Sequence, residues 1–407
     1  MKHVVVLGDG MADRPLPELG GRTPLQAARK PNMDNLARRG EVGMVRTVPE
    51  GMPPASDVAN LSVMGYDPAK YYTGRSPLEA VSMGIDLAPT DVAIRCNLVT
   101  LSDEAEYADK TMVDYCSDEI STDEARELIA EVQRRLGTER FAFHPGVSYR
   151  HCMVWKEGLL GLGLTPPHDI SLRGVRDYLP PGDRGLPILG LMRESHAFLK
   201  DHQVNRSRRA RGLKPANSIW LWGEGTKPAI PSFRDKYGLQ GAVVSAVDLI
   251  KGLGLCAGMR SIDVEGATGN IHTNFRGKAM AALRELEAGR DFVYIHIEAP
   301  DECGHRHEIE NKVRAIELID EEVLGPLLAG LGSMGDHSLM VLPDHATPLS
   351  LRTHSMEPVP YIIYRSGRFG GSGLDGYDEF LAQRTGIMVE AGHGLMGRFL
   401  GATASPA

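Results

Sequence analysis

The clearest pattern along the chain is a set of short runs that are almost entirely apolar. They occupy residues 3–7, 292–297 and 339–342. Runs of this kind, rich in Val and Ile, are typical of strands buried on both faces of a parallel sheet. A helical pattern over 32–39 and a second strand over 43–48 follow the first run, which is the order of a β-α-β unit. We therefore predict an α/β domain with a mainly parallel sheet sandwiched by helices.

Each of these strands leads into acidic residues. Asp9 follows the first run, Glu298 and Asp301 follow the second, and Asp344 follows the third. Parallel strands deliver their carboxyl ends to one edge of a sheet, so we expect these carboxylates to converge there. Converging carboxylates are costly unless a positive charge neutralises them. A metal cluster is therefore predicted at this edge.

Histidines near the acids complete a set of candidate metal ligands. Asp301 and His305 are four residues apart, which places both side chains on one face of a helix. His345 directly follows Asp344, and His354 lies a few residues beyond. Each feature alone has an ordinary structural interpretation, so the prediction rests on all of them lying at one edge. Carboxylates with imidazoles suit Mn²⁺, Mg²⁺ or Zn²⁺, and two such ions can activate an oxygen nucleophile for phosphoryl transfer.

A serine supplies the candidate nucleophile. Ser56 follows the turn at 53–55 and precedes an amphipathic segment. A serine in that position is by default a helix N-cap. A helix N-terminus also stabilises anions, so a phosphorylated Ser56 would be favoured there. Both interpretations, a cap and a nucleophile, stay open at this point.

The middle of the chain has a different pattern. Residues 101–254 contain Pro- and Gly-rich turns and alternating segments such as 148–155. This pattern predicts a smaller α/β domain inserted into a core domain made of 1–100 and 255–407. We expect the insertion to bind substrate and to close as a lid, because phosphoryl transfer must exclude water.

Composition narrows the classes of protein. A length of 407 residues suits two domains, and a formal charge of −8 argues against a nucleic-acid partner. No run approaches the roughly 18 apolar residues of a membrane span, and no signal-peptide pattern begins the chain. The five cysteines form no CxxC pair, which argues against a disulfide framework and a thiolate zinc site. We expect a cytoplasmic enzyme that acts on a small phosphorylated substrate, with neither nucleic-acid nor membrane partners and with its oligomeric state open.

Several short motifs together resemble one family. They lie at residues 8–13, 20–25, 31–34, 71–75, 299–305, 343–345 and 354–360. The set resembles the archaeal-type cofactor-independent phosphoglycerate mutases of the alkaline phosphatase superfamily, over nearly the whole chain. The resemblance implies an alkaline-phosphatase-like core and a glycolytic isomerase that interconverts 3- and 2-phosphoglycerate without 2,3-bisphosphoglycerate.

The resemblance also implies the site. It implies a phosphoserine intermediate at Ser56 and two divalent metal ions, with Mn²⁺ as the first choice and Mg²⁺, Zn²⁺ and Co²⁺ as alternatives. One metal would be held by Asp9, Ser56, Asp344 and His345, and the other by Asp301, His305 and His354. The remaining candidates for substrate binding are Arg75, Arg95, Asn97, Arg150, His151 and Lys251. Each of these six also has an ordinary structural interpretation.

Two stretches depart from the family pattern. Residues 113–119 and 221–225 lack the arginines that would clamp a phosphate and a carboxylate bidentately. In this respect the chain resembles a bacterial branch sometimes proposed to be homoserine kinases. One alternative is therefore ATP-dependent phosphorylation of homoserine at the same site, for which an adenine pocket involving Trp220 and Trp222 would be the distinguishing feature. A metal-dependent phosphomonoesterase and a non-enzymatic metal-binding protein are further alternatives.

Overall fold

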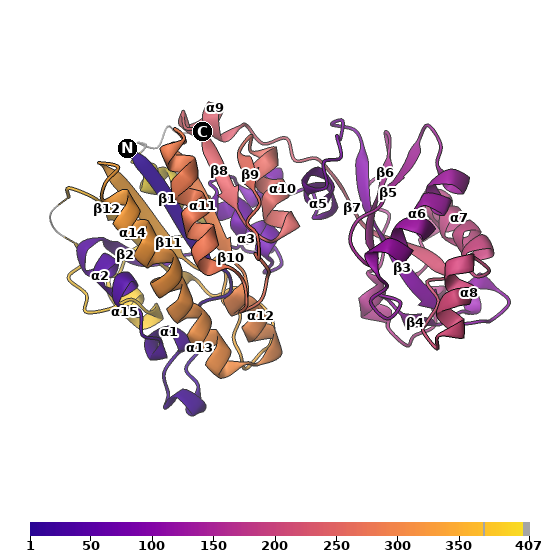
Figure 1. Cartoon of the computed structure of the whole chain (residues 1–407), viewed down its shortest axis with the longest axis horizontal. Coiled ribbons are helices and arrows are strands. Elements are labelled where there is room, and N and C mark those ends of the chain that lie inside the picture. The colour runs from indigo at the N-terminus through magenta and orange to yellow at the C-terminus, as the bar shows by residue number, and fades with distance from the viewer. Residues whose placement is uncertain (369–370, 402–407) are drawn as a thin grey trace. The chain divides into compact units, whose positions relative to one another are not determined.

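The computed structural model describes residues 1–368 and 371–401, and the chain divides into two compact units. Unit 1 is Met1–Tyr72 with Ile230–Ala407, and unit 2 is Thr73–Ala229 (Figure 1). The predicted boundaries at 100/101 and 254/255 were therefore wrong. Hydrophobic pattern alone does not tell which sheet a strand joins: the strand at 92–101 is central in unit 2, and the strand at 241–244 belongs to unit 1.

Within the described residues, unit 1 is built on an eight-stranded sheet in the order β13-β2-β12-β11-β1-β10-β8-β9. Its strands are β1 (Lys2–Gly8), β2 (Glu41–Val45), β8 (Gly241–Val244), β9 (Arg260–Ile262), β10 (Phe292–Ile297), β11 (His337–Leu342), β12 (Val359–Arg365) and β13 (Met388–Val389). β1 is central and pairs in parallel with β10 and β11, whereas β12 runs antiparallel to β11 and β2. The predicted mainly parallel α/β sheet is confirmed.

Helices cover both faces of this sheet (Figure 1). One face carries α2 (Pro31–Arg39), α11 (Phe275–Glu287), α13 (Ile309–Leu318), the π-helical turn η5 (Ile319–Leu324) and α14 (Gly325–Leu331). Their apolar residues form one core with Val4 and Val6 of β1. The opposite face carries α3 (Ser56–Val63), α10 (Asp248–Cys256) and α16 (Leu395–Leu400). Two-sided burial explains why the central strands are apolar at nearly every position.

Two elements differ slightly from their predicted bounds. The helix expected over 32–39 is α2, whereas the strand expected over 43–48 is β2, which ends at Val45. It ends there because its antiparallel partner β12 begins at Val359, opposite Val45. Within the described residues, none of the helices combines the length and the apolar character needed to cross a membrane.

The register of the central strands positions the site. Gly8 of β1 lies opposite Ile297 of β10, and Leu7 lies opposite Leu342 of β11. The segments that follow these strands therefore leave the sheet at one edge. The segment after β10 continues into α12 (Ala299–Arg306). The predicted convergence of strand ends is confirmed by this register.

Unit 2 contains a second, five-stranded sheet whose described pairings are all antiparallel. Its strands are β3 (Val92–Leu101), β4 (Met112–Asp114), β5 (Phe141–His144), β6 (Arg150–Trp155) and β7 (Ser218–Thr226). Helices α6 (Thr122–Leu136) and α7 (Gly182–Leu199) pack on the face that carries Ile94, Cys96 and Leu98. Because side chains alternate along a strand, Arg95 and Asn97 face the other side, where α5 (Ser76–Ser82) packs.

Candidate active site

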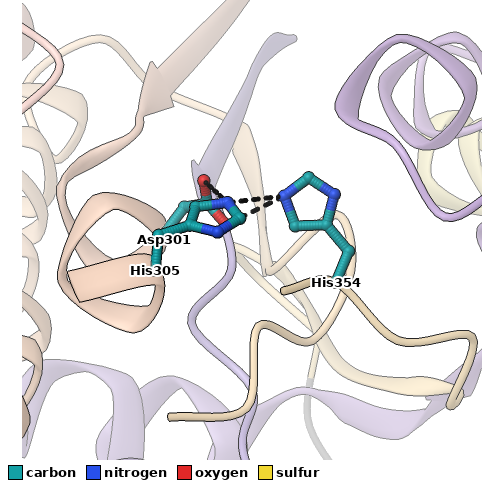
Figure 2. A group of neighbouring side chains, drawn as sticks. All are labelled: Asp301, His305 and His354. Carbon is teal, nitrogen blue, oxygen red and sulfur yellow. Dashed lines mark hydrogen bonds and ion pairs between the residues drawn. The ribbon is translucent and has the colours of Figure 1, made fainter. Parts of the chain in front are cut away.

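Three residues of the predicted set lie together at the carboxyl edge of the unit 1 sheet. Asp301 and His305 come from one turn of α12, and His354 comes from the loop before β12 (Figure 2). The carboxylate oxygens of Asp301 lie 3.2 Å from His305 Nε2 and 3.4 Å from His354 Nε2. The two Nε2 atoms are 2.9 Å apart. All three ligand atoms thus point at one place.

The other ring nitrogens fix the tautomers of these histidines. His305 Nδ1 lies 3.0 Å from the carbonyl oxygen of Arg352, and His354 Nδ1 lies 2.9 Å from that of Pro54. A carbonyl oxygen can only accept, so each Nδ1 carries the proton and donates it. Each Nε2 therefore faces the other ring and the Asp301 carboxylate, and when a bound cation displaces the Nε2 proton its lone pair points at that cation. Converging acceptors of this kind fit a bound cation.

The electrostatics of this trio also favour positive charge. The hydrogen bond with Asp301 raises the pKa of His305 to about 9. Burial alone would lower the pKa of His354, but its hydrogen bond with Asp301 raises it. Burial alone would raise the pKa of Asp301. Its hydrogen bonds with the two histidines nevertheless hold this pKa well below the usual range. The Asp301 carboxylate is therefore ionised, and its negative charge favours a bound cation.

A second cluster surrounds the end of β1. Asp9 is 1% exposed and Asp344 is fully buried. His345 Nε2 lies 3.5 Å from Asp9 Oδ1, 3.4 Å from Asp344 Oδ2 and 3.2 Å from Ser56 Oγ. Asp9 Oδ1 accepts no hydrogen bond within the part of the chain that the structure describes. Leaving such an atom unpaired is costly, so its position fits coordination to a metal ion.

Burial and like charge perturb this cluster strongly. Burial, with the neighbouring Asp344 and Asp301 carboxylates, raises the pKa of Asp9 well above its usual value. Burial also lowers the pKa of His345, which keeps the ring neutral. Groups perturbed in this way by desolvation and by a specific neighbour are typical of functional sites.

Thr347 fixes the orientation of His345. Its hydroxyl donates to Asp301 Oδ1, because a carboxylate can only accept. The hydroxyl oxygen is then an acceptor for His345 Nδ1, which lies 3.3 Å away. His345 is thereby protonated at Nδ1, and the lone pair of Nε2 faces Ser56 Oγ.

Ser56 is the first residue of α3, but it does not cap the helix. The N-cap is Ala55, and no side chain caps this terminus. The serine hydroxyl contacts His345 instead, so the interpretation of Ser56 as an N-cap was wrong. Asn60 holds the helix in place by donating to Ser56 O and Asp344 Oδ2, and it accepts from the Tyr294 hydroxyl.

Besides Thr347, a histidine of the site was missed from the sequence. His296 lies on β10, fully buried, with Nε2 2.9 Å from Asp9 Oδ2 and Nδ1 3.3 Å from Ser245 Oγ. Burial lowers the pKa of His296 to about 3, so the ring is neutral and its Nε2–H donates to the carboxylate. This bond orients Asp9. The available signal was a single imidazole within an otherwise apolar strand.

The implied ligands therefore lie together. Three overlapping groups have ligand atoms within 4.8 Å of one another: Asp301 with His305 and His354, Asp9 with His296 and Asp344, and Asp9 with Asp301 and His345. Ser56 joins them through its contact with His345. The arrangement combines a hydroxyl nucleophile with a dense set of carboxylate and imidazole donors, which suits metal-assisted phosphoryl transfer.

Unit 2 has a cavity of about 240 Å³ on the face of its sheet that α6 and α7 leave uncovered. Its lining is Arg75, Glu79, Arg95, Asn97, Tyr115, Tyr149, Arg150, His151, His168 and Trp222. It thus contains all the predicted substrate-binding residues except Lys251. Lys251 lies on α10 of unit 1, with its ammonium group 2.7 Å from Asp263 Oδ1.

Arginines and aromatic rings define this cavity. Glu79 accepts from Arg75 Nε at 2.9 Å and from Arg95 Nε at 2.7 Å. The guanidinium of Arg95 lies over Trp222, and that of Arg150 lies over Tyr149, each 4.4 Å from the ring centroid. Within the described residues, Arg150 has no carboxylate partner, so its charge is available to an anionic ligand.

Two further predicted residues take structural positions. Trp220 is buried in the core of unit 2, and its Nε1 donates to the carbonyl oxygen of Thr165. It is therefore not available to an adenine ring, although Trp222 lines the cavity. His151 is 4% exposed and accepts from Gly146 N through Nδ1, so the ring is largely part of the protein interior.

Comparison with known proteins agrees with this geometry. A family model described as 2,3-bisphosphoglycerate-independent phosphoglycerate mutase matches residues 37–205. A relative from Geobacter sulfurreducens, named a probable enzyme of that description, is 52% identical over 97% of this chain and 98% of its own. A relative from Methanothrix thermoacetophila with the same name, without the qualifier, is 51% identical over the same shares.

The chain belongs to the 2,3-bisphosphoglycerate-independent phosphoglycerate mutase family. Two solved structures share its fold over the full length. One is a Pyrococcus horikoshii protein, 28% identical, with a TM-score of 0.82 over 100% of this chain and 99% of the other. The second is a cofactor-independent phosphoglycerate mutase from Thermoplasma acidophilum, also 28% identical, with a TM-score of 0.69 over 99% and 100%. The resemblance inferred from motifs to this mutase family is confirmed.

Proposed function

We propose that this protein interconverts 3-phosphoglycerate and 2-phosphoglycerate through a phosphoserine at Ser56, with two divalent metal ions and without 2,3-bisphosphoglycerate. The observation that carries the proposal is the position of Ser56 Oγ, 3.2 Å from the Nε2 lone pair of His345 and beside two sets of metal donors. The full-length relatives named as mutases support the choice of substrate.

The donors fit two divalent ions. Asp301, His305 and His354 would hold one ion, and Asp9, Ser56, Asp344 and His345 the other. Mixed carboxylate, hydroxyl and imidazole donors suit Mn²⁺ first, with Mg²⁺, Zn²⁺ and Co²⁺ as alternatives. Such ions favour the ionised form of a serine hydroxyl and neutralise the charge of a transferring phosphoryl group.

The protein's own groups organise the transfer. Ser56 Oγ gives up its proton and attacks the phosphorus of 3-phosphoglycerate, the bond to the substrate's 3-oxygen breaks, and that oxygen takes up a proton. The 2-hydroxyl of the reoriented glycerate then gives up its proton and attacks the phosphoserine, and the released Ser56 Oγ takes up a proton. Between these steps the phosphoserine lies at the first residue of α3, where the helix N-terminus favours a phosphate.

Unit 2 would provide substrate recognition. Arg95, Arg150 and Asn97 offer charged and amide donors on one wall of its cavity, and Glu79 orients Arg95. These groups suit the carboxylate or phosphate of a small substrate. Unit 2 would also close as a lid, because water must be kept from the phosphoserine while the glycerate turns.

The alternatives are weaker on specific grounds. Homoserine kinase activity needs an adenine site, and Trp220, one of the two residues considered for it, is buried. The relatives at 51% and 52% identity are named mutases. A phosphomonoesterase would use the same site with water as the acceptor, so only the product distinguishes it.

The test is a direct comparison of substrates. Purified protein with Mn²⁺ is offered 3-phosphoglycerate and, separately, ATP with homoserine, and both reactions are followed by phosphorus NMR. We expect a 2-phosphoglycerate resonance and no phosphohomoserine. Phosphohomoserine as the main product would establish the kinase instead, and inorganic phosphate from 3-phosphoglycerate would establish the phosphomonoesterase.

A further inference from the structure

A fully buried ion pair lies next to the ligand cluster and has no part in the proposed chemistry. Lys312 and Asp13 are both fully inaccessible in their side chains, with Lys312 Nζ 2.7 Å from Asp13 Oδ2. The same ammonium group donates to the carbonyl oxygen of Thr347 at 2.7 Å and lies 3.5 Å from that of Ala12. Burying two charges is costly, so such a pair calls for a reason beyond stability.

The partners in this network come from the three segments that carry the candidate ligands. Asp13 lies in the segment that follows β1, four residues after Asp9. Thr347 follows Asp344 and His345 after β11. Lys312 is on α13, directly after the helix that carries Asp301 and His305. The Asp13 carboxylate also accepts from Leu349 N at 3.1 Å, which ties the first two segments together a second time.

Thr347 touches a ligand from each proposed metal set. Its hydroxyl donates to Asp301 Oδ1 and accepts from His345 Nδ1. Asp301 belongs to one set and His345 to the other. The Thr347 hydroxyl therefore links the positions of the two metal-ligand sets. Lys312 binds the backbone carbonyl oxygen of the same threonine.

The packing around Thr347 leaves little room for movement. Gly10 has a φ of +60°, and a Cβ there would lie 2.5 Å from Thr347 Oγ1 and 2.7 Å from Asp301 Oδ1. A Cβ on Gly304 of α12 would lie 2.7 Å from Thr347 O. Contacts this close allow no side chain at either glycine, so both neighbours approach the threonine as backbone only.

We infer that Thr347, held by the buried Lys312–Asp13 pair, is a positioning residue that sets the spacing between the two metal ions. The inference rests on the proposed two-metal site. Outer groups that orient ligands typically change metal affinity about 10- to 100-fold when they are removed. Thr347 acts on both ions because its hydroxyl is shared between the two sets.

The test compares Thr347→Val, which keeps the shape but loses the hydroxyl, with Thr347→Ser, which keeps the hydroxyl. Mn²⁺ binding is measured by titration calorimetry, and the spectrum of the doubly loaded protein is recorded by electron paramagnetic resonance, where coupling between two Mn²⁺ ions reports their separation. We expect Thr347→Val to bind Mn²⁺ about 10- to 100-fold more weakly and with altered coupling. Thr347→Ser should restore both.

Thr100→Val is the matched control. Thr100 is buried in unit 2, and its hydroxyl donates to the carbonyl oxygen of Pro215 at 2.8 Å. This variant loses a comparable hydrogen bond and should leave Mn²⁺ binding unchanged. Lys312→Met adds a second probe, with weakened binding expected for both ions. If that variant does not fold, the Thr347 pair decides alone.

The outcomes distinguish failure of the two-metal site from failure of the positioning role of Thr347. Wild-type protein that fails to bind two Mn²⁺ ions would overturn both the two-metal site and this inference. Wild-type binding of two ions, with the same affinities and the same coupled spectrum in Thr347→Val, would overturn the positioning role and leave the proposed mutase site intact.

Discussion

The site in unit 1 and the cavity in unit 2 have opposite chemistry. In unit 1, buried carboxylates and imidazole lone pairs converge on one edge of a parallel sheet and include an oxygen of Asp9 without a hydrogen-bond partner in the described chain. In unit 2, arginine side chains and aromatic rings line one face of an antiparallel sheet. The first arrangement suits metal ions and a reacting phosphoryl group, and the second suits an anionic substrate. Variants in the two regions should therefore affect different kinetic constants.

The largest expected effect comes from the nucleophile. Ser56→Ala should lower kcat by several orders of magnitude, because removing a nucleophile abolishes the step it performs. Its melting temperature should stay close to wild type, since the serine caps no helix. Ser62→Ala is the control, because Ser62 lies on the same helix and its buried hydroxyl has no hydrogen-bond partner in the described chain. Steady-state kinetics showing near-normal turnover for Ser56→Ala would remove the basis for assigning chemistry to unit 1.

Metal removal should come next. Chelation should reduce mutase activity to background, and Mn²⁺ should restore it. Stripped protein should also melt at a lower temperature, because bound ions stabilise the folded state by mass action and neutralise Asp9 and Asp344. Activity and calorimetric melting curves, measured on the same samples, check both expectations. Full activity in protein shown by elemental analysis to lack metal would contradict the assignment of the donors.

A smaller and different effect is expected in unit 2. Arg150→Met should raise KM for 3-phosphoglycerate about 10- to 100-fold, because a hydrogen bond to a charged group contributes roughly 1.5–3 kcal/mol. The change in kcat should be only a few-fold. Arg140→Met is the control, since Arg140 lies outside the cavity and over Trp155. A loss confined to kcat in Arg150→Met would mean that the division between chemistry and recognition is wrong.

The smallest expected effect concerns a turn of unit 2 that lies outside the cavity lining. Ser117, Asp118 and Glu119 have φ values of 50°, 54° and 48°, a run of left-handed residues without a glycine. The left-handed region costs a residue with a Cβ roughly 1–2 kcal/mol. Glu119→Gly should therefore raise the unfolding free energy of unit 2 by about 1 kcal/mol, measured by denaturant titration, without changing kcat. Glu127→Gly, on the exposed side of α6, should lower it by a similar amount. A destabilised Glu119→Gly protein would show that the run carries no strain.

The sequence was most informative for site residues that directly follow a predicted strand or share one helical turn. Asp9, Asp301 and Asp344 could be predicted because parallel strands share a carboxyl edge, and the i, i+4 spacing of Asp301 and His305 fixed their common face. His296 and Thr347 could not, since their roles depend on register and loop geometry that bring them to Asp9 and Asp301. The limits of unit 2 were missed because the hydrophobic patterns of β3 and β8 do not reveal which sheet each strand joins.

The grouping of the predicted substrate-binding residues also depends on strand register. Arg95, Asn97 and Arg150 share one face because β3 and β6 pair with Asn97 opposite Arg150. Their grouping depends on this antiparallel register, which spacing along the chain does not reveal. Lys251 was included on residue type alone, and its position on α10 beside Asp263 places it in the other unit.

Trapping the phosphoserine is the most direct test of phosphoryl transfer through Ser56. Protein loaded with Mn²⁺ is mixed with 3-phosphoglycerate labelled in its phosphate, quenched within milliseconds, digested and mapped by mass spectrometry. We expect label on the peptide that contains Ser56, formed and lost at rates compatible with turnover, and absent in Ser56→Ala. Label on another residue, or turnover without any labelled peptide, would contradict transfer through Ser56.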